Sequence, residues 1–401
     1  MSKFEFPDCP SELIYMDNNA TTVVAQEAID EMLPYLKLNY GNPSSMHKLG
    51  ATAGNAVDRA RDQVMNLLGV ESPLELVFTG SGSESDNMAI IGTIRAYPEK
   101  KHIVTTVVEH PAVMGLCREL EKHHGIEVTW LDVDSKGRLD LAQLRDSLRD
   151  DTALVSIIAA NNETGVIFPY EEIGKIVKER GIIYHVDAVQ VAGKLPLDMS
   201  TSTIDLLSIS AHKLHGCKGV GALYVRRGTK LRPLIVGGHQ ERGRRAGTEN
   251  VPGLVVFGKA CELAAGQLET ENSFVRDLRD RLEKKIIATV PDCRINGVVD
   301  KRLPNTTNIS FDYIEGEGIL LMLNLAKIAA SSGSACTSGS LEPSHVLKAM
   351  GIPFISAHGS IRFSLSRFNS EAEVDYVAAV MPQIIEKLRS ITPFNQGRKT
   401  F

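Results

Sequence analysis

The chain contains, at the end of an apolar run, the stretch Ser208-Ile209-Ser210-Ala211-His212-Lys213-Leu214-His215-Gly216-Cys217-Lys218-Gly219-Val220-Gly221. No acidic residue that could pair with the Lys213 amine lies between Leu206 and Gly221. The charges of His212 and Lys218, together with partial burial, are expected to lower the pKa of Lys213. An amine with a lowered pKa attacks carbonyl groups and forms Schiff bases. Taken alone, however, the stretch is also typical of a surface lysine in the turn after a strand.

A carboxylate that would complete such a site lies upstream, at the end of the apolar stretch Ile182–Asp187. Asp187 precedes Lys213 by 26 residues (213 − 187), enough for a connection and a second strand that ends beside the first. In enzymes that use pyridoxal 5′-phosphate (PLP), an aspartate keeps the pyridine nitrogen protonated, so that the ring accepts electrons. Asp187 and Lys213 together therefore favour a PLP site.

Further sequence motifs are spread over nearly the whole chain. They are Tyr15–Thr22 (YMDNNATT), Val107–Val113 (VVEHPAV), Asn161–Gly165 (NNETG), Gly238–Asn250 (GHQERGRRAGTEN), Ser332–Ser340 (SGSACTSGS) and Ile361–Leu365 (IRFSL). On these motifs the sequence resembles the cysteine desulfurases of aminotransferase class V, most closely the NifS type of nitrogen fixation. The resemblance implies the type I fold of PLP-dependent transferases, as in aspartate aminotransferase.

Composition and charge narrow the class of protein. The chain has 401 residues, 43% of them hydrophobic and 23% charged, so we expect a globular protein with room for two domains. A net charge of −5 gives no reason to expect nucleic acid or a membrane surface as a partner. The six cysteines (9, 117, 217, 261, 293 and 336) form no CxxC pair, which favours the cytoplasm and indicates neither a disulfide framework nor an intrinsic metal site. Neither a targeting leader nor a membrane span is indicated.

Apolar runs alternate with connections of helix or loop length between residues 76 and 209. The runs are Leu76–Thr79, Ile103–Thr106, Val128–Leu131, Leu154–Ile158, Ile182–Val186 and Leu206–Ile209. This alternation predicts a largely parallel sheet with helices on its faces. The next run, Ala222–Val225, follows Ser210 too closely for a crossover helix and should therefore lie antiparallel. The sequence thus predicts an α/β fold with a seven-stranded, mixed, mostly parallel sheet, preceded by helices over 24–38 and 51–68.

The pattern changes after residue 250 to long amphipathic helices, one of which has Leu278, Leu282 and Ile286 on a single face. Short strands are expected at Asn308–Phe311 and Ile361–Leu365. We therefore divide the chain into a large PLP-binding domain, residues 17–260, and a smaller α+β domain, residues 1–16 plus 261–401. The smaller domain contains the cysteine of the serine-rich motif.

A glycine- and serine-rich turn, Thr79–Ser85, follows one predicted strand and opens a predicted helix. Backbone N–H groups at a helix N-terminus attract phosphate, and Gly80 and Gly82 would let the anion come close. Ser83, where the family more often has threonine, adds a hydroxyl donor. Such a turn is commonly only a helix cap. Together with the other motifs it becomes the expected phosphate site, with Gly82 and Ser83 as ligands.

The resemblance gives roles to further polar residues around the cofactor. His110 would stack on the cofactor ring and take part in proton transfer, although a histidine at a strand end is more often structural. Asn162 and Gln190 would hydrogen-bond the phenolic oxygen of the cofactor. Ser210 and His212 would be additional phosphate ligands.

Two residues are assigned by the resemblance to the partner subunit and to the substrate. Thr248 would reach the cofactor phosphate of the other subunit in a homodimer. Arg362 presents a fork suited to a carboxylate and would bind the substrate α-carboxylate, with Asn162 nearby. An ordinary surface salt bridge is the alternative reading of Arg362.

Cys336 lies in Ser331–Ser340, a segment with five serines and two glycines that has too little apolar content to pack as a core element. An exposed thiol in a loop is suited to reaction and to reaching both a cofactor and an acceptor. The resemblance makes Cys336 the nucleophile that carries sulfur as a persulfide, through which it would transiently ligate an iron–sulfur cluster. The other five cysteines are interpreted as structural, including Cys217, which stands where the family usually has proline.

The predicted activity is PLP-dependent removal of sulfur from L-cysteine, giving L-alanine and a Cys336 persulfide, with Lys213 moving the α-proton. Sulfur would pass to an iron–sulfur scaffold protein of the NifU type, in the service of nitrogenase. A selenocysteine lyase, or another PLP-dependent lyase or aminotransferase of the same fold, is the alternative. Such a lyase or aminotransferase would need Asp187 and Lys213 but not the thiol. A non-catalytic protein that binds PLP or sulfur would keep the fold and show no turnover.

Overall fold

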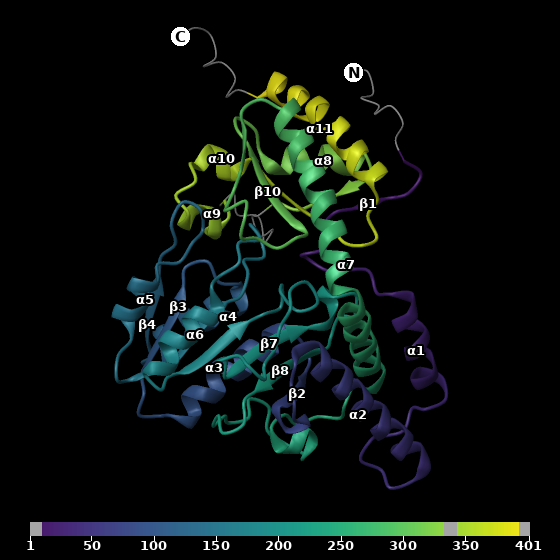
Figure 1. Ribbon diagram of the computed structural model, residues 1–401, viewed down its shortest axis with the longest axis vertical. Coiled ribbons are helices and arrows are strands. Elements are labelled where there is room, and N and C mark those ends of the chain that lie inside the picture. Colours follow the sequence, from purple (N-terminus) through teal and green to yellow (C-terminus); the bar gives the residue numbers. More distant parts are fainter. Residues whose placement is uncertain (1–9, 333–342, 393–401) are drawn as a thin grey trace.

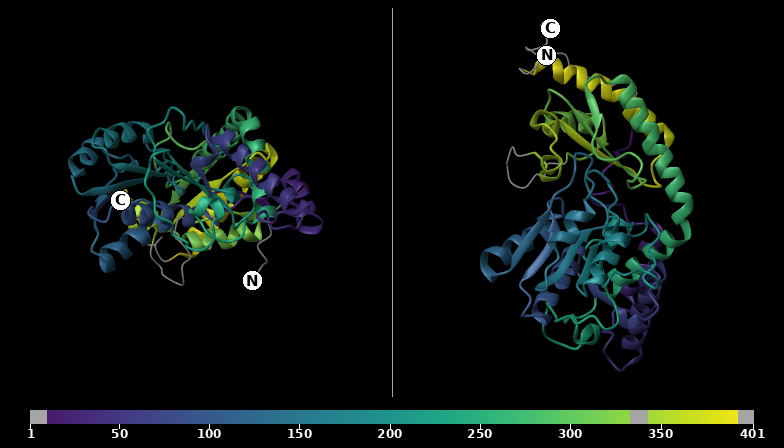
Figure 2. Two further views of the ribbon diagram at one scale, coloured as in Figure 1. Left: turned by 90° about the horizontal axis from the view of Figure 1, so that it is seen from below. Right: turned by 60° about the vertical axis from the view of Figure 1, so that its left-hand side comes forward.

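The computed structural model describes residues 10–332 and 343–392. A large sheet with its helices fills the lower part of Figure 1, and smaller sheets fill the upper part. Helix α7, Val251–Thr289, runs from one part to the other, and Figure 2 shows it along one side of the molecule.

The large sheet has seven strands in the order β2-β8-β7-β6-β5-β3-β4. Its strands are β2 (Leu76–Thr79), β3 (His102–Thr106), β4 (Glu127–Leu131), β5 (Thr152–Ile158), β6 (Ile183–Asp187), β7 (Leu206–Ser210) and β8 (Gly221–Val225). Only β8 pairs antiparallel, with β2 on one side and β7 on the other. The predicted seven-stranded mixed sheet is confirmed, including the direction of β8, because the short connection after Ser210 leaves no room for a crossover.

Helices cover both faces of this sheet. One face packs against α3 (Gly82–Ala96) and α4 (Pro111–His124), and the other against α2 (Lys48–Leu68), α6 (Tyr170–Glu179) and the first half of α7. The remaining helices of this part are α1 (Gln26–Lys37) and α5 (Leu141–Ser147). Helix α3 starts where Ser81 caps it by accepting the Glu84 N–H, and α4 starts at Pro111, whose missing N–H costs nothing in the first turn.

The smaller sheets lie in the upper part of Figure 1. Strands β9 (Cys293–Ile295), β10 (Thr306–Phe311) and β12 (Ser360–Ser364) form an antiparallel sheet, and β1 (Ile14–Tyr15) pairs with β11 (Ile328–Ala329). Four helices accompany them: α8 (Gly316–Leu325), α9 (His345–Ala349), α10 (Phe354–His358) and α11 (Glu371–Ile391). The strands predicted around residues 308 and 361 are therefore present as β10 and β12.

Helix α7 contributes to two hydrophobic cores. Its first half, up to Ala264, packs into the core of the large sheet, and its second half, from Val275, packs into the core of the small sheet. Leu278, Leu282 and Ile286 are buried together in the second core, as their spacing predicts. The domain boundary predicted at residue 260 falls inside this helix, and the division into 17–260 and 1–16 plus 261–401 stays a prediction.

A buried ion pair holds the segment that precedes α7 against the large sheet. The guanidinium of Arg61 on α2 contacts both carboxylate oxygens of Glu241, at 3.0 and 2.6 Å. The same carboxylate accepts the backbone N–H of Phe78 in β2 at 3.0 Å. Glu241 and Arg242 have positive φ angles of 46° and 60°, which cost energy for residues with a side chain. The ion pair therefore holds a strained turn against the sheet.

We predict that Glu241→Ala lowers the free energy of unfolding by about 3–5 kcal/mol, because it leaves the Arg61 guanidinium buried without its partner. A lower urea midpoint, followed by circular dichroism, measures the loss. The exposed pair Arg59–Glu31 provides the control, since its atoms are 3.5 Å apart and the Arg59 side chain is 53% exposed. Arg59→Ala should cost less than about 1 kcal/mol. Equal losses in the two variants would contradict the assignment.

Candidate active site

A cavity of about 390 Å³ opens where β5, β6 and β7 end and where α3 and α4 begin. Ten of the twelve site residues predicted from the sequence line it: Gly82, Ser83, His110, Asn162, Asp187, Gln190, Ser210, His212, Lys213 and Arg362. They come from segments spread over 281 positions (362 − 82 + 1) of the chain. Thr248 lies elsewhere, and Cys336 falls outside the described residues.

Lys213 ends a short 3₁₀ turn, Ala211–Lys213, directly after β7. Its Nζ donates hydrogen bonds to the carbonyl oxygens of Asn19 and Ala20 at 2.5 and 2.8 Å. The pKa of Lys213 is lowered to about 8, mainly by burial and also by the positive charge of Arg362, against the opposing carboxylates of Asp187 and Asp17. A lowered pKa was predicted from partial burial and from the charges of His212 and Lys218, and burial is the main cause. The positive charge that lowers it is that of Arg362, 149 positions away in sequence (362 − 213).

Asp187 and His110 face the same cavity. Asp187 is almost fully buried, and its Oδ1 accepts the Val189 N–H at 2.9 Å. Burial raises the pKa of Asp187, whereas the charges of His110 and Lys213 oppose that rise. Burial also lowers the pKa of His110, so its ring is neutral at physiological pH. The Nδ1 atom of His110 accepts the Ala112 N–H, which places the ring proton on Nε2.

The turn before α3 has the properties of an anion site. A Cβ atom on Gly82 would lie 2.8 Å from a Val189 methyl group, so only glycine fits. The Ser210 hydroxyl is buried and has no hydrogen-bond partner in the described part of the chain. Gly80 was also expected to admit the anion, and this was wrong. Its N–H donates to the Glu84 carboxylate at 2.8 Å, so it is already satisfied and does not line the cavity.

Arg362 projects from β12 into the opposite side of the cavity. Its Nη1 donates to the Asn162 carbonyl at 2.9 Å and its Nη2 to the Asp17 carboxylate at 2.8 Å. Its Nε is buried and has no partner among residues 10–332 and 343–392. The guanidinium is therefore fixed in place, with donor capacity left for a carboxylate.

Two residues of the cavity, Asn19 and Asp86, and a third next to it, Asp17, were missed as site residues. Asn19 accepts with its carbonyl from Lys213 and Gln190, and its side-chain amide bonds the Asn162 carbonyl and Thr306. Asp17 forms an ion pair with Arg362 but does not itself line the cavity. Asp86 lines the cavity from α3 and is 1% exposed. The motif Tyr15–Thr22 was recognised as part of the resemblance, and its run of short polar residues was the available signal for Asn19 and Asp17.

Comparison with known proteins identifies the family to which the chain belongs. Residues 14–377 match the family described as aminotransferase class-V. The chain is 60% identical over 382 residues to a protein of Nostoc sp. named cysteine desulfurase, and the match covers 95% of each chain. This chain is a cysteine desulfurase of the class V aminotransferase family.

Two further comparisons agree. The desulfurase is 53% identical over 384 residues to the cysteine desulfurase NifS of Azotobacter vinelandii, with 96% of this chain and 95% of that protein covered. A solved structure of a NifS-like protein superposes with a TM-score of 0.88 at 39% identity, covering 94% of this chain and all of the other. The predicted family and fold are thereby confirmed.

Class V cysteine desulfurases use PLP, and the residues of this cavity fit that cofactor. Gly82 and the unpartnered Ser210 hydroxyl lie at the start of α3, where a phosphate is stabilised by backbone N–H groups and the helix dipole. Asp187 is a buried carboxylate that would suit a ring nitrogen, and Lys213 an amine of lowered pKa that would suit an aldehyde.

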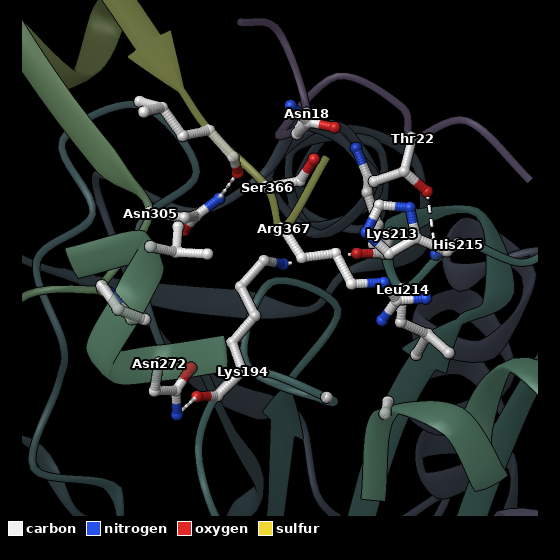
Figure 3. Close-up of a pocket in the computed structure, with 15 residues that line it drawn as sticks. Asn18, Thr22, Lys194, Lys213, Leu214, His215, Asn272, Asn305, Ser366 and Arg367 are labelled. Carbon is white, nitrogen blue, oxygen red and sulfur yellow. Dashed lines mark hydrogen bonds between the residues drawn. The ribbon is translucent and has the colours of Figure 1, made fainter. Parts of the chain in front are cut away.

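A second, smaller cavity of about 40 Å³ lies next to Lys213 of the desulfurase (Figure 3). It has room for no more than a few water molecules. Here the Thr22 hydroxyl accepts the His215 N–H at 2.8 Å, and Asn272 of α7 donates to the Lys194 carbonyl. The Lys194 amine in turn donates to the Lys213 carbonyl at 3.4 Å. The N-terminal segment and α7 thus support the backbone of Lys213 from the side away from the active-site cavity.

Thr248 lines a separate depression of about 170 Å³, together with Gly80, Glu241 and Arg245. Its side chain is exposed, and Arg245 beside it pairs with Glu84 of α3 at 2.7 Å. One chain therefore does not bring Thr248 into its own cofactor cavity.

The four described cysteines are poor nucleophiles in this desulfurase. Cys117 and Cys261 are buried, and burial raises the pKa of the Cys117 thiol to about 12 and that of Cys261 well above its usual range. Cys217 and Cys293 are partly buried, and burial raises their pKa values too. Cys217, the departure from the family, donates to the Gly253 carbonyl at 3.8 Å and does not line the cavity. Cys9 and Cys336 lie outside the described residues.

Proposed function

We propose that this enzyme removes sulfur from L-cysteine with PLP, releases L-alanine and stores the sulfur as a persulfide on Cys336. The observation that carries the proposal is the convergence of Lys213, Asp187, the α3 turn and Arg362 on one cavity. The relatives that are 53–61% identical are named cysteine desulfurases, which supports cysteine as the substrate. Selenocysteine, which differs from cysteine in a single atom, is a second substrate to be tested with the same assay.

Each residue of the cavity has a distinct task in this proposal. PLP, when bound, supplies a ring that accepts the electron pair left at the substrate α-carbon. Arg362 binds the substrate carboxylate, and Asp187 holds the proton on the ring nitrogen. Lys213 binds the cofactor aldehyde and, when released by the substrate, moves the α-proton as a base of lowered pKa. His110, neutral and with its proton on Nε2, donates toward the ring.

Cys336 provides the step that distinguishes desulfuration. Its thiolate attacks the substrate sulfur, so that a sulfur–sulfur bond forms as the carbon–sulfur bond breaks and the electron pair moves to the alanine carbon. The high pKa values of the four described cysteines support this choice, because a thiol that is protonated at neutral pH is a weak nucleophile.

The activity assay uses purified enzyme, PLP and L-cysteine, and measures alanine, sulfide, keto acid and ammonia. Alanine and sulfide in equal amounts are expected in the presence of a reductant. Keto acid with ammonia would instead indicate a β-lyase, amino-group transfer to an added keto acid would indicate an aminotransferase, and no product would indicate a binding protein. The same assay with selenocysteine compares kcat/KM for the two substrates.

The proposal for the physiological partner is supported by the relatives. We propose transfer of sulfur to an iron–sulfur scaffold protein of the NifU type in the cytoplasm, in the service of nitrogenase, because NifS of Azotobacter vinelandii is 53% identical over nearly the whole chain. No helix among the described residues is both long and apolar enough to cross a membrane. Transfer of labelled sulfur from the enzyme to a purified scaffold protein, compared with a housekeeping scaffold, tests the assignment.

We propose a homodimer in which Thr248 contacts the cofactor phosphate of the partner subunit. The exposed position of Thr248 supports this arrangement, and so do large apolar side chains left exposed near the N-terminus, such as Tyr40 and Met46, which are 73% and 100% exposed.

Mixing Lys213→Ala chains with Thr248→Ala chains should therefore restore activity. A heterodimer of the two variants contains one site with both residues intact, whereas each homodimer lacks one of them in both sites. Refolded or coexpressed mixtures, purified by two affinity tags, are compared with each variant alone. Activity no higher than that of the Thr248→Ala homodimer would show that Thr248 does not act across an interface.

A further inference from the structure

Asp86 is a buried carboxyl group in the wall of the active-site cavity. It lies in the first half of α3, is 1% exposed, and its Oδ1 has no hydrogen-bond partner in the described part of the chain. A buried carboxylate with an unpartnered oxygen is costly, whereas a neutral carboxyl group costs much less. None of the tasks proposed above uses this residue.

Asp86 meets a row of polar side chains on the sheet below it. Its Oδ1 is 3.6 Å from Nε2 of His185, a fully buried histidine of β6. The imidazole lies between two serine hydroxyls: Nδ1 is 2.8 Å from Ser156 Oγ of β5, and Nε2 is 2.9 Å from Ser208 Oγ of β7. Burial lowers the pKa of His185 to about 3, so the ring is neutral. The row therefore connects three adjacent strands beneath α3.

This row lies directly beside Asp187. Residues 185 and 187 of β6 point to the same face of the sheet, because side chains alternate along a strand. Ser208 is the register partner of Asp187 across the β6–β7 pair. Two buried carboxyl groups so placed cannot both be ionised without a large electrostatic cost. Burial raises the pKa of Asp86 well above its usual range, the charge of Asp187 raises it further, and Ser208 opposes both.

We propose that Asp86 is a positioning residue of the cofactor site, a neutral carboxyl group that donates its proton into the Ser208–His185–Ser156 row and leaves the negative charge on Asp187. The inference rests on the proposed function, in which Asp187 must be ionised to hold a protonated ring nitrogen.

The direction of the hydrogen bonds in the row depends on Asp86. If Asp86 is protonated, it donates to Ser208 Oγ, Ser208 donates to Nε2 of His185, and the imidazole carries its proton on Nδ1. If Asp86 is ionised, it accepts from Ser208, Ser208 accepts from Nε2–H, and Ser156 donates to Nδ1. A neutral imidazole has one donor and one acceptor nitrogen, so the two cases exclude each other. The tautomer of His185 therefore reports the charge of Asp86.

The first test reads that tautomer in the intact holoenzyme labelled with ¹⁵N-histidine. The His185 signals are assigned by their loss in His185→Gln, and solid-state NMR distinguishes Nδ1–H from Nε2–H. Nδ1–H is expected in the wild type. It is also expected in Asp86→Asn, because the amide donates to Ser208 as the neutral acid does. Nε2–H in the wild type would overturn the proposal.

The second test compares Asp86→Asn with Asp86→Leu, which removes both donor and acceptor. Asp86→Asn should bind PLP within about threefold of wild type and keep the pH midpoint of the cofactor's visible absorbance. Asp86→Leu should weaken PLP binding by roughly 10- to 100-fold, because it leaves buried polar partners unpaired. If Asp86→Leu does not fold, Asp86→Asn alone still tests the proposal through the pH midpoint of the cofactor's absorbance. If its midpoint falls, the wild-type aspartate carries a charge and the proposal fails.

Glu109→Gln is the matched control. Glu109 is another fully buried carboxyl group, with its pKa raised by burial to about 8, but it does not line the cavity. Its Oε1 accepts from Thr106 and from the Ile158 N–H, which glutamine can reproduce. PLP affinity and the absorbance midpoint should stay at wild-type values. If Glu109→Gln weakened PLP binding as much as Asp86→Leu does, any buried carboxyl group would have this effect, and the proposal would be overturned. Alanine formation by the wild type, measured in parallel, tests the proposed function separately.

Discussion

Replacing Lys213 by alanine is expected to leave the enzyme folded but unable to hold PLP covalently or to form alanine. The side chain supplies both the amine that binds the cofactor aldehyde and the base for the α-proton. Loss of a positioned base alone typically slows a reaction by about 10²- to 10⁴-fold. Purified wild-type protein should be yellow and lose that colour on borohydride reduction, whereas the variant should carry no cofactor that borohydride fixes to the chain.

Lys218→Ala is the matched control, because Lys218 lies five positions further along the same basic turn (218 − 213) and is exposed. It should keep the colour and the turnover of wild type. Wild-type turnover in Lys213→Ala would show that another amine binds the cofactor.

The lowered pKa of Lys213 adds a pH dependence to this prediction. An amine with a pKa of about 8 is mostly protonated, and therefore unreactive, below that pH. The rate at which apo-protein takes up PLP should consequently rise as the pH passes through 8. Arg362→Gln removes a positive charge that lowers this pKa, so the midpoint should move to higher pH. Stopped-flow absorbance measures both midpoints, and an unmoved midpoint in Arg362→Gln would exclude the influence of Arg362.

Much of the fold could be predicted because its signals are local. Apolar runs separated by helix-length connections gave the parallel strands, and the short link between Ser210 and β8 gave the one antiparallel strand. The end of the large domain could not be placed in the same way. Helix α7 runs without a break from Val251 to Thr289, and the change of core between Ala264 and Val275 depends on tertiary packing that no local sequence signal marks.

In the site, too, residues marked by local motifs could be predicted, whereas residues placed by distant contacts could not. Lys213 and Asp187 follow apolar strands, so their place at the strand ends could be predicted from periodicity. Asp86 could not, because an aspartate in the first turns of a helix is usually exposed and favours the helix dipole. The packing of α3 on the sheet places Asp86 in the cavity wall and beside His185, which is 99 positions away in sequence (185 − 86). Burial, the main cause of the lowered pKa of Lys213, was predicted as one of its causes, whereas the charge of Arg362 was missed because that residue is also distant in sequence.

Cys336→Ala should separate desulfuration from all other PLP chemistry of this enzyme. In the proposed function, cofactor binding depends on Lys213, Asp187 and the α3 turn, which line one cavity and include no thiol. The variant should therefore keep its visible absorbance and still respond spectrally to L-cysteine. Alanine release in a single turnover should be lost, because none of the four described cysteines lines the cavity and burial raises the pKa of each. Radiolabelled sulfur should likewise fail to remain on the protein.

A single turnover is the decisive measurement, because an external reductant cannot regenerate a persulfide that never forms. Cys217→Ala is the matched control: it changes the cysteine nearest to Lys213 in sequence, and that thiol is partly buried against the Gly253 carbonyl. It should release alanine at the wild-type rate, and Cys9→Ala, outside the described residues, should do the same. If Cys336→Ala releases alanine normally and Cys217→Ala does not, the nucleophile is Cys217. The Gly216–Lys218 turn must then open to bring its sulfur past Lys213 to the substrate.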